Sequence, residues 1–457
     1  MNPSTAHANA QRRKDKIITR TSVLWLGLFL TLFSAPSASA QEVADTIRVR
    51  TRVVFMDALV KDKKTGIPIS DLKPDNFELF ADGKPRAISY FTRDGQARKP
   101  LAMVIILDCR EDGAGRFLKR PEILKSIADE LAKLPPGDEV GVMAMNIGAN
   151  EKRVWLTTFT NDPAKIAAAL ARVPAFVEHP DNAPSLPTEA EKQKTAETAR
   201  QQSKGSVTVT AGAEDNKAGD KAAEKTAQNK RKPEDIVETE TIKGKNGAVV
   251  TRTVMKDGSV NLKRVSSSGN VTIELDDVYD MAAAVRDATR TSEQERPNSQ
   301  PAIVWVSDGI APIFYEDRDA TEQILIRSNA IFNSLTVDLR TLFKFLMPIG
   351  KPLAGWMGVS LYGSAKLLAQ QSGGEAVRVH RTSDYGVGLA KIIGNLTARY
   401  SLGFALSEQE KDDGRMHELA VRVKALDAKG KQRKLEVSSR RGYYMPKSDT
   451  DQAVANK

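Results

Sequence analysis

The stretch of sequence that decides the fold is Leu101-Ala102-Met103-Val104-Ile105-Ile106-Leu107, which ends at Asp108. A continuous apolar run of this kind is typical of a strand that is buried on both faces of its sheet. A second run, Ile303-Val304-Trp305-Val306, is followed in the same way by Ser307 and Asp308. Strands of this type occur in sheets that helices cover on each side, so the two runs predict the middle of a parallel sheet.

Helical and strand patterns alternate along the chain on either side of these two runs. Further strands are predicted at Val140–Met145, Val154–Phe159, Val337–Leu342 and Ala376–Val379. Helices are predicted at Pro121–Leu134, Pro163–Val173, Asp276–Arg290, Thr321–Leu335, Leu361–Gln371 and Asp384–Arg399. This alternation predicts an α/β fold with a doubly wound, mostly parallel sheet.

The two ends of this region carry a different pattern, in which apolar and polar residues alternate. The pattern begins at Ile47–Val53 and includes two hairpin signals with Gly66 and Gly83 at the turns. It returns near the carboxyl end, in the segments Tyr400–Leu406, His417–Lys424 and Lys434–Tyr444. We therefore expect the amino- and carboxy-terminal segments to complete one β module that flanks the α/β domain.

The alternation of strands and helices breaks between Val177 and about Asn270. From Thr188 to Pro233 the only large apolar residues are Val207 and Val209. Such a stretch buries too little surface to offset the entropy of ordering, so we expect it to be disordered. Behind it, the segments Ala248–Met255 and Ser259–Val265 predict a small hairpin or meander.

The first forty residues have the three-part layout of a secretory signal. Basic residues lead, the apolar stretch Val23–Phe33 follows, and Ala38-Ser39-Ala40 ends the segment, so cleavage is expected before Gln41. This predicts a secreted or periplasmic protein without a stable membrane span. The apolar stretch is about half of the ~20 residues that a span needs, and an uncleaved anchor is the alternative.

The predicted organisation is a signal peptide at 1–40, an N-terminal β segment at 45–98, the α/β domain in two parts at 100–176 and 271–399, the insertion at 177–270, C-terminal β strands at 400–446 and a disordered tail at 447–457.

Composition excludes several classes of function. The chain has 68 Lys and Arg residues against 58 Asp and Glu residues, and the two signs are mixed almost everywhere. A mixed pattern on an exported chain argues against a nucleic-acid partner. The one cysteine, Cys109, excludes an internal disulfide framework and any multi-thiolate metal site.

Asp108 and Asp308 are the first candidates for a functional site. In open α/β sheets, ligands bind beyond the carboxyl ends of the strands, at the point where the strand order reverses. If the order is the common 3-2-1-4-5-6, that point lies between the strands that end at Leu107 and Val306. The two carboxylates are then expected to meet there, although an Asp-Gly pair such as Asp308-Gly309 is also ordinary turn chemistry.

These motifs resemble those of a von Willebrand factor type A domain. The flanks narrow the resemblance to the secreted "VWFA-related" proteins that are typical of Acidobacteria. The segments that carry the resemblance are Leu107-Asp108, Ser307-Asp308-Gly309, Asp71-Leu72, Phe77–Pro85, Gln371–Gly374, Arg399–Phe404 and Arg440–Tyr444. The resemblance implies a type A fold and an adhesion function.

Type A domains hold a divalent cation in a metal-ion-dependent adhesion site, whose first element is Asp-x-Ser-x-Ser. Here that element reads Asp108-Cys109-Arg110-Glu111-Asp112. The resemblance implies Asp108, Asp112, Thr272 and Asp308 as ligands, with Thr272 standing for the threonine of a second loop. Mg²⁺ takes such hard oxygen ligands, and a partner's carboxylate would fill its open position.

Arg110 makes this metal site degenerate, because a guanidinium is always charged and cannot bind a metal. Two readings stay open. In the first, Arg110 turns outward, and Asp108, Asp112 and Asp308 bind a divalent cation such as Mg²⁺ weakly. In the second, Arg110 takes the place of the cation and pairs with Asp108 and Asp308, and the surface of the metal-free domain binds carboxylates through a charge-assisted fork.

The sequence thus predicts an exported, non-enzymatic interaction protein that binds a protein, matrix or envelope component and needs no cofactor. One alternative is a metal-assisted, phosphatase-like hydrolase that uses Asp108 and Asp308. The other is a structural envelope protein whose site is vestigial.

Overall fold

The computed structural model describes residues 52–93, 98–109, 115–147, 151–176, 208–211, 235–256, 260–276, 281–337, 355, 358–407, 409–410 and 413–445. The predicted signal peptide at 1–40 and the tail at 447–457 lie outside these residues, as do Arg110 and Asp112. Within the described ranges, no helix has the length and apolarity that a membrane crossing requires.

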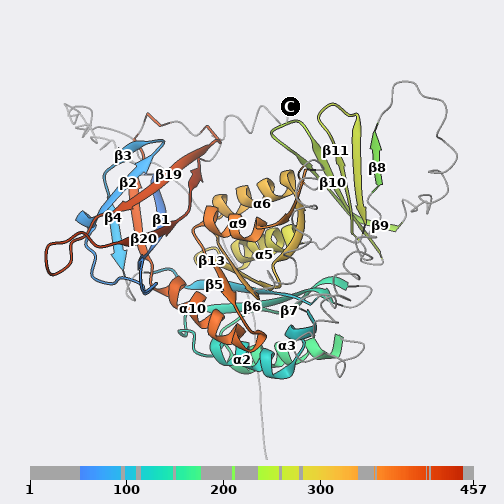
Figure 1. The fold of residues 1–457 in the computed structure, drawn as a ribbon, viewed down its shortest axis with the longest axis horizontal. Coiled ribbons are helices and arrows are strands. Elements are labelled where there is room, and N and C mark those ends of the chain that lie inside the picture. Colours follow the sequence, from blue (N-terminus) through green and yellow to red (C-terminus); the bar gives the residue numbers. More distant parts are fainter. Residues whose placement is uncertain are drawn as a thin grey trace, which may run out of the picture. The chain divides into compact units, whose positions relative to one another are not determined.

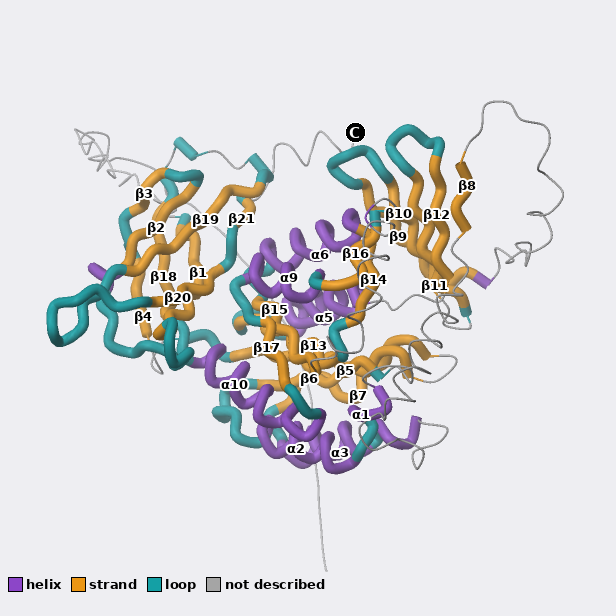
Figure 2. The backbone as a smooth tube through the Cα atoms, viewed as in Figure 1, coloured by secondary structure: helices purple, strands orange, loops and turns teal. Residues whose placement is uncertain are grey.

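The centre of the fold is a six-stranded sheet with the order β17-β15-β13-β5-β6-β7, whose strands are labelled in Figure 2 and of which Figure 1 labels β13, β5, β6 and β7. Its strands are β5 (Leu101–Asp108), β6 (Glu139–Ile147), β7 (Glu151–Thr160), β13 (Gln300–Ser307), β15 (Ile331–Val337) and β17 (Ala376–Val379). Every pair is parallel except β6 with β7, which is antiparallel. Counted along the chain, the order is 3-2-1-4-5-6, and the mixed α/β fold with a mostly parallel sheet is confirmed.

Helices cover both faces of this sheet (Figure 2). One face packs against α1 (Gly115–Leu118), α2 (Pro121–Leu131), α3 (Pro163–Ala171) and α10 (Tyr385–Thr397), and the other against α5 (Met281–Glu295), α6 (Tyr315–Arg327) and α9 (Ser364–Ser372). Alternate residues of β5 enter the two cores, Met103 and Ile105 on one face and Val104 and Ile106 on the other. All eight residues of β5 and of β13 are buried, as their apolar runs predicted.

The predicted helix Thr321–Leu335 is wrong in its second half. Helix α6 ends at Arg327, and β15 begins at Ile331. Between them, Asn329 has a φ of 49°, a left-handed conformation that ends a right-handed helix. Likewise, the start of the predicted helix Leu361–Gln371 belongs to a strand. Here β16 (Val359–Tyr362) pairs with β14 (Ile310–Phe314) before α9 begins.

The insertion, together with residues 271–276 just after its predicted end, contains a five-stranded antiparallel sheet with the order β8-β12-β11-β10-β9, which we call the insertion sheet. Its strands are β8 (Thr208–Ala211), β9 (Ile236–Lys243), β10 (Val249–Met255), β11 (Val260–Val265) and β12 (Val271–Asp276). The predicted meander is confirmed as β10 and β11. Strand β8 lies in the stretch for which we expected disorder, and its Val209 pairs with Ile273. The rest of that stretch lies outside the described residues.

Buried ion pairs tie this sheet to the α/β domain. Arg286 of α5 is 1% exposed, and its Nη2 donates to Oε2 of Glu240 in β9 at 2.7 Å. Its Nη1 donates to Asp317 and, at 2.9 Å, to Thr321 in α6. Arg264 of β11 pairs with Glu316 of α6 at 2.9 Å. The insertion sheet is therefore attached to α5 and α6 by charge pairing, which the sequence did not reveal.

Strands from both ends of the described chain form the flanking β module, as the sequence predicted. Its two sheets have the orders β20-β1-β18-β4 and β21-β19-β2-β3. Their strands are β1 (Val53–Asp62), β2 (Phe77–Ala81), β3 (Lys84–Arg86), β4 (Tyr90–Arg93), β18 (Tyr400–Ala405), β19 (Met416–Val423), β20 (Leu435–Ser439) and β21 (Gly442–Tyr444). Buried Tyr400 links the two ends, because its hydroxyl donates to the Ile69 carbonyl at 2.9 Å and accepts from the Leu72 backbone N–H.

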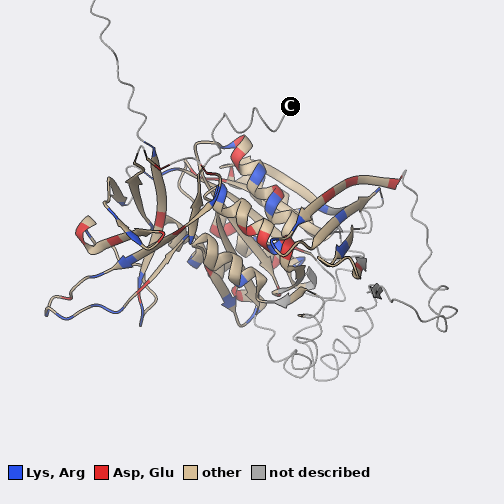
Figure 3. Ribbon diagram, turned by 90° about the horizontal axis from the view of Figure 1, so that it is seen from above, with Lys and Arg blue, Asp and Glu red and all other residues tan. Residues whose placement is uncertain are grey.

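Figure 3 shows basic and acidic residues interspersed over the described helices and strands.

Candidate functional site

The carboxyl ends of β5 and β13 bring Asp108 and Asp308 to one place. The two strands are parallel neighbours, with Leu107 opposite Val306. The Ser307 hydroxyl donates to Oδ2 of Asp108 at 2.6 Å and lies 3.3 Å from Oδ1 of Asp308. The two carboxylates therefore share one hydroxyl at the point where the strand order reverses. We call Asp108, Ser307 and Asp308 the acidic crevice.

The acidic crevice is buried, with Asp108 at 1% and Asp308 at 5% exposure. A hydroxyl has a single proton, so Ser307 donates to one carboxylate at a time. An isolated buried charge is very costly, so two buried carboxylates need hydrogen bonds or opposite charge nearby. Lys119 is 5% exposed, and its charge acts on the Cys109 thiol next to Asp108.

Cys109 itself is an inert member of this region. Burial, with the charge of Asp108 adding to it, raises the pKa of the thiol to about 12, and Lys119 opposes the shift. The thiolate is the reactive form of cysteine, and at neutral pH this side chain stays protonated. The structure thus offers no activated thiol at Cys109.

Tyr385 forms part of the same region from the start of α10. Its side chain is fully buried, and its hydroxyl donates to the Ser307 carbonyl at 3.3 Å. Burial raises the pKa of Tyr385, and the charges of Asp308 and Asp108 raise it further. A protonated phenol is a donor, so Tyr385 positions the backbone of the acidic crevice.

The turn after Asp308 requires a glycine. Gly309 has a φ of 85°, a conformation that residues with a Cβ rarely adopt. This agrees with the ordinary turn chemistry of an Asp-Gly pair. Asp308 therefore meets Asp108 and also begins a tight turn, and the two roles are compatible.

The remaining predicted site residues are not part of this arrangement as described. Thr272 lies in β12 of the insertion sheet, opposite Val265 and Thr210, and not in a loop. The alternation around buried Ile273 explains the difference, because it favours strand pairing. Arg110 and Asp112 lie outside the described residues. Metal binding by Asp108, Asp112, Thr272 and Asp308 stays a prediction.

The sequence pointed to neither Ser307 nor Tyr385 as a part of this region. For Ser307, a hydroxyl next to an acid at a strand end was a usable signal. Tyr385 had no signal, because it lies 78 positions from the Ser307 backbone that it contacts. Across the described ranges, no three or more His, Cys, Asp or Glu side chains cluster in a way that could hold a metal ion.

No protein-family model and no curated protein matches this chain. Among solved structures, it is similar to the pilus adhesin SpaC from Lactobacillus rhamnosus GG in its open conformation, with 8% identity and a TM-score of 0.30. That match covers 82% of this chain and 48% of SpaC, so the chain spans about half the length of that relative. It is also similar to the vWF domain of the type V pili tip protein Mfa5 from Porphyromonas gingivalis, with 10% identity, a TM-score of 0.22, and coverage of 66% of this chain and 95% of that domain. TM-scores at this level define neither fold nor function.

Proposed function

We propose that this chain is an exported, non-enzymatic interaction protein whose α/β domain is of the von Willebrand factor type A kind. Its partner is a protein of the envelope or the extracellular matrix, and the contact surface is the rim of the acidic crevice. One observation supports this most: Asp108 and Ser307, separated by 199 positions, bond at 2.6 Å where the strand order reverses. That position is where open α/β sheets bind their ligands.

We propose further that the metal site of this domain is degenerate. The oxygens of Asp108, Ser307 and Asp308 are ligand types that Mg²⁺ accepts, and a bound cation would polarise a partner's carboxylate. The sequence argues against a resident metal, because Arg110 stands where a hydroxyl is expected. Arg110 then binds the partner's carboxylate through a charge-assisted fork.

Calorimetry with Mg²⁺ and Mn²⁺ on residues 41–457 tests the degenerate site. We expect no micromolar binding by the natural chain and measurable binding after Arg110→Ser with Asp112→Ser. The matched control is Asp129→Ser with Lys133→Ser, which makes the same change in charge at two exposed positions, one in α2 and one just after it. Micromolar binding by the natural chain would contradict the proposal.

The alternative hydrolase is tested with a generic phosphate ester in the presence of Mg²⁺ or Mn²⁺. We expect no turnover above the buffer rate. Turnover that Asp108→Asn and Asp308→Asn abolish, while Asp129→Asn preserves it, would overturn the non-enzymatic assignment. A pull-down from envelope extract tests the structural alternative. If Arg110→Ala abolishes capture of an envelope component, the chain is an interaction protein; unchanged capture would favour a structural protein.

A further inference from the structure

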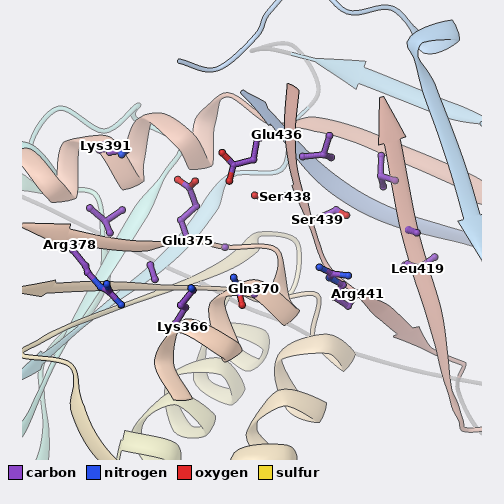
Figure 4. Close-up of a pocket in the computed structure, with 16 residues that line it drawn as sticks. Lys366, Gln370, Glu375, Arg378, Lys391, Leu419, Glu436, Ser438, Ser439 and Arg441 are labelled. Atoms are coloured by element: carbon purple, nitrogen blue, oxygen red, sulfur yellow. The ribbon is translucent and has the colours of Figure 1, made fainter. Parts of the chain in front are cut away.

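A polar groove of about 630 Å³ lies where α9 and β17 approach β19 and β20 (Figure 4). Backbone segments form much of its wall. These are residues 374–378 around β17, residues 436–439 of β20 and residues 419–421 of β19. Four side chains from other positions complete it, namely Lys366, Gln370, Lys391 and Arg441. We call this the cationic groove.

The cationic groove runs along strand edges. Successive side chains of a strand point to opposite faces of its sheet, so a cavity that touches five consecutive residues follows the edge of the strand. Strand β17 is the last strand of the six-stranded sheet, and β20 is the last strand of its own sheet. In the part of the chain that the structure describes, the outer edge of β17 has no strand partner. Such an edge is a template on which another extended chain can pair.

The charge of the groove is predominantly positive. Lys366 comes from α9, Arg378 from β17, Lys391 from α10 and Arg441 from the connection between β20 and β21. All four are exposed, and none of the ion pairs between described residues involves their side chains. The groove has two acids, Glu375 and Glu436.

One of these two acids is already engaged. Glu375 accepts hydrogen bonds from Lys61 and from Asn395, so its charge is largely neutralised within the protein. Glu436 is the remaining negative charge against four cations. An occupant of this groove must therefore bring negative charge of its own.

We propose that the cationic groove binds an extended acidic segment of a partner protein, which adds as a strand to the open edge of β17. Four residues of β17 offer roughly 13 Å of edge at about 3.3 Å per residue, enough for a short peptide segment. The two helices that flank this edge cover opposite faces of the sheet, and each places a lysine in the groove, Lys366 from α9 and Lys391 from α10. Figure 4 shows the two lysines on either side of β17.

This placement sets the sequence preference of the partner. Residues of an added strand point alternately toward the α9 side and the α10 side. Because Lys366 lies on the α9 side and Lys391 on the α10 side, a partner with consecutive acidic residues is favoured over one with an acidic residue at every second position. The surface is separate from the acidic crevice, and the inference does not depend on the proposed function.

Fluorescence anisotropy tests the charge requirement, with residues 41–457 and a labelled hexapeptide that has four consecutive glutamates flanked by valines. We expect saturable binding at low salt, and Lys366→Glu with Arg378→Glu should weaken it by at least about tenfold. The control pair is Lys84→Glu with Lys165→Glu, which makes the same change in charge on exposed lysines elsewhere and should leave affinity within about twofold. If the double variant Lys366→Glu with Arg378→Glu fails to fold, Lys366→Gln with Arg378→Gln replaces it in the same measurement. No binding by the natural chain, or equal losses in both pairs, would overturn the proposal.

A second peptide tests the strand pairing. N-methylation at alternate peptide bonds keeps every charge but removes the backbone donors that pair with a strand edge. We expect the methylated peptide to bind at least about tenfold more weakly. Equal binding, together with displacement by a sulfated oligosaccharide, would assign the groove to polyanions in general and overturn the strand mode. Lys366→Glu with Arg378→Glu should leave capture of the envelope component unchanged, so failure here is distinct from failure of the crevice.

Discussion

The acidic crevice and the cationic groove place charge in opposite ways. In the crevice, Asp108 and Asp308 are almost fully buried and share the hydroxyl of Ser307. In the groove, Lys366 and Arg378 are exposed and make no ion pair with another described residue. The crevice charges contribute to the packing of the central sheet, whereas the groove charges are available to a ligand.

The physical reason for the difference is the surrounding dielectric. A charge in the low-dielectric interior interacts strongly with its neighbours and is costly to leave unmatched. A charge on the surface is solvated, and its pairing contributes little to stability. Changes in the crevice should therefore alter the free energy of unfolding, and changes in the groove should alter binding alone.

Ser307→Ala should produce the largest effect on stability. The substitution removes the donor that a buried carboxylate accepts from, and such hydrogen bonds to charged groups contribute about 1.5 to 3 kcal/mol. We expect the free energy of unfolding, measured by urea denaturation, to fall by about 2 to 3 kcal/mol. Ser334→Ala in neighbouring β15 is the control matched for burial and should cost less than about 1 kcal/mol. Equal costs would show that the shared hydroxyl has no special role.

The pH dependence of stability above pH 9 should reveal the burial of Cys109. Its pKa is about 12 in the folded protein against an ordinary value of 9.0, so the unfolded chain loses the thiol proton first. Stability is therefore unaffected below pH 9 and falls as the pH rises toward 12, by roughly 1 kcal/mol at pH 10. Cys109→Ala should lack this component in urea titrations at pH 8 and pH 10. If the variant and the natural chain lose the same stability, the thiol is not held in a buried site.

Charge reversal in the cationic groove should have the smallest effect on stability. Lys366→Glu with Arg378→Glu changes exposed side chains, so the free energy of unfolding should change by less than about 0.5 kcal/mol. The same urea titration measures this change. A loss above about 2 kcal/mol would contradict the contrast between the two regions, because the groove cations would then be structural.

The contrast between the two regions also explains which parts of the fold and of the candidate site could be predicted from the sequence. The apolar runs before Asp108 and Asp308 identified the central strands, since burial on both faces leaves a continuous hydrophobic signal. Two acids at the ends of such strands, together with the common strand order, predicted that they meet. The flanking β module was visible because the period of two is local. The limit of helix α6 was missed, because the left-handed Asn329 has no such signal.

The sequence by itself determined the strand and helix classes and the two central strands, because burial and periodicity depend on neighbours along the chain. The meeting of Asp108 with Asp308 followed only once a common strand order was assumed. Only the tertiary structure decided which other side chains lie beside them, such as Tyr385. It also decided the whole cationic groove, whose members come from two helices and three strands. Packing of distant elements leaves no periodic trace in a sequence, so sites of that kind appear only when the chain is folded.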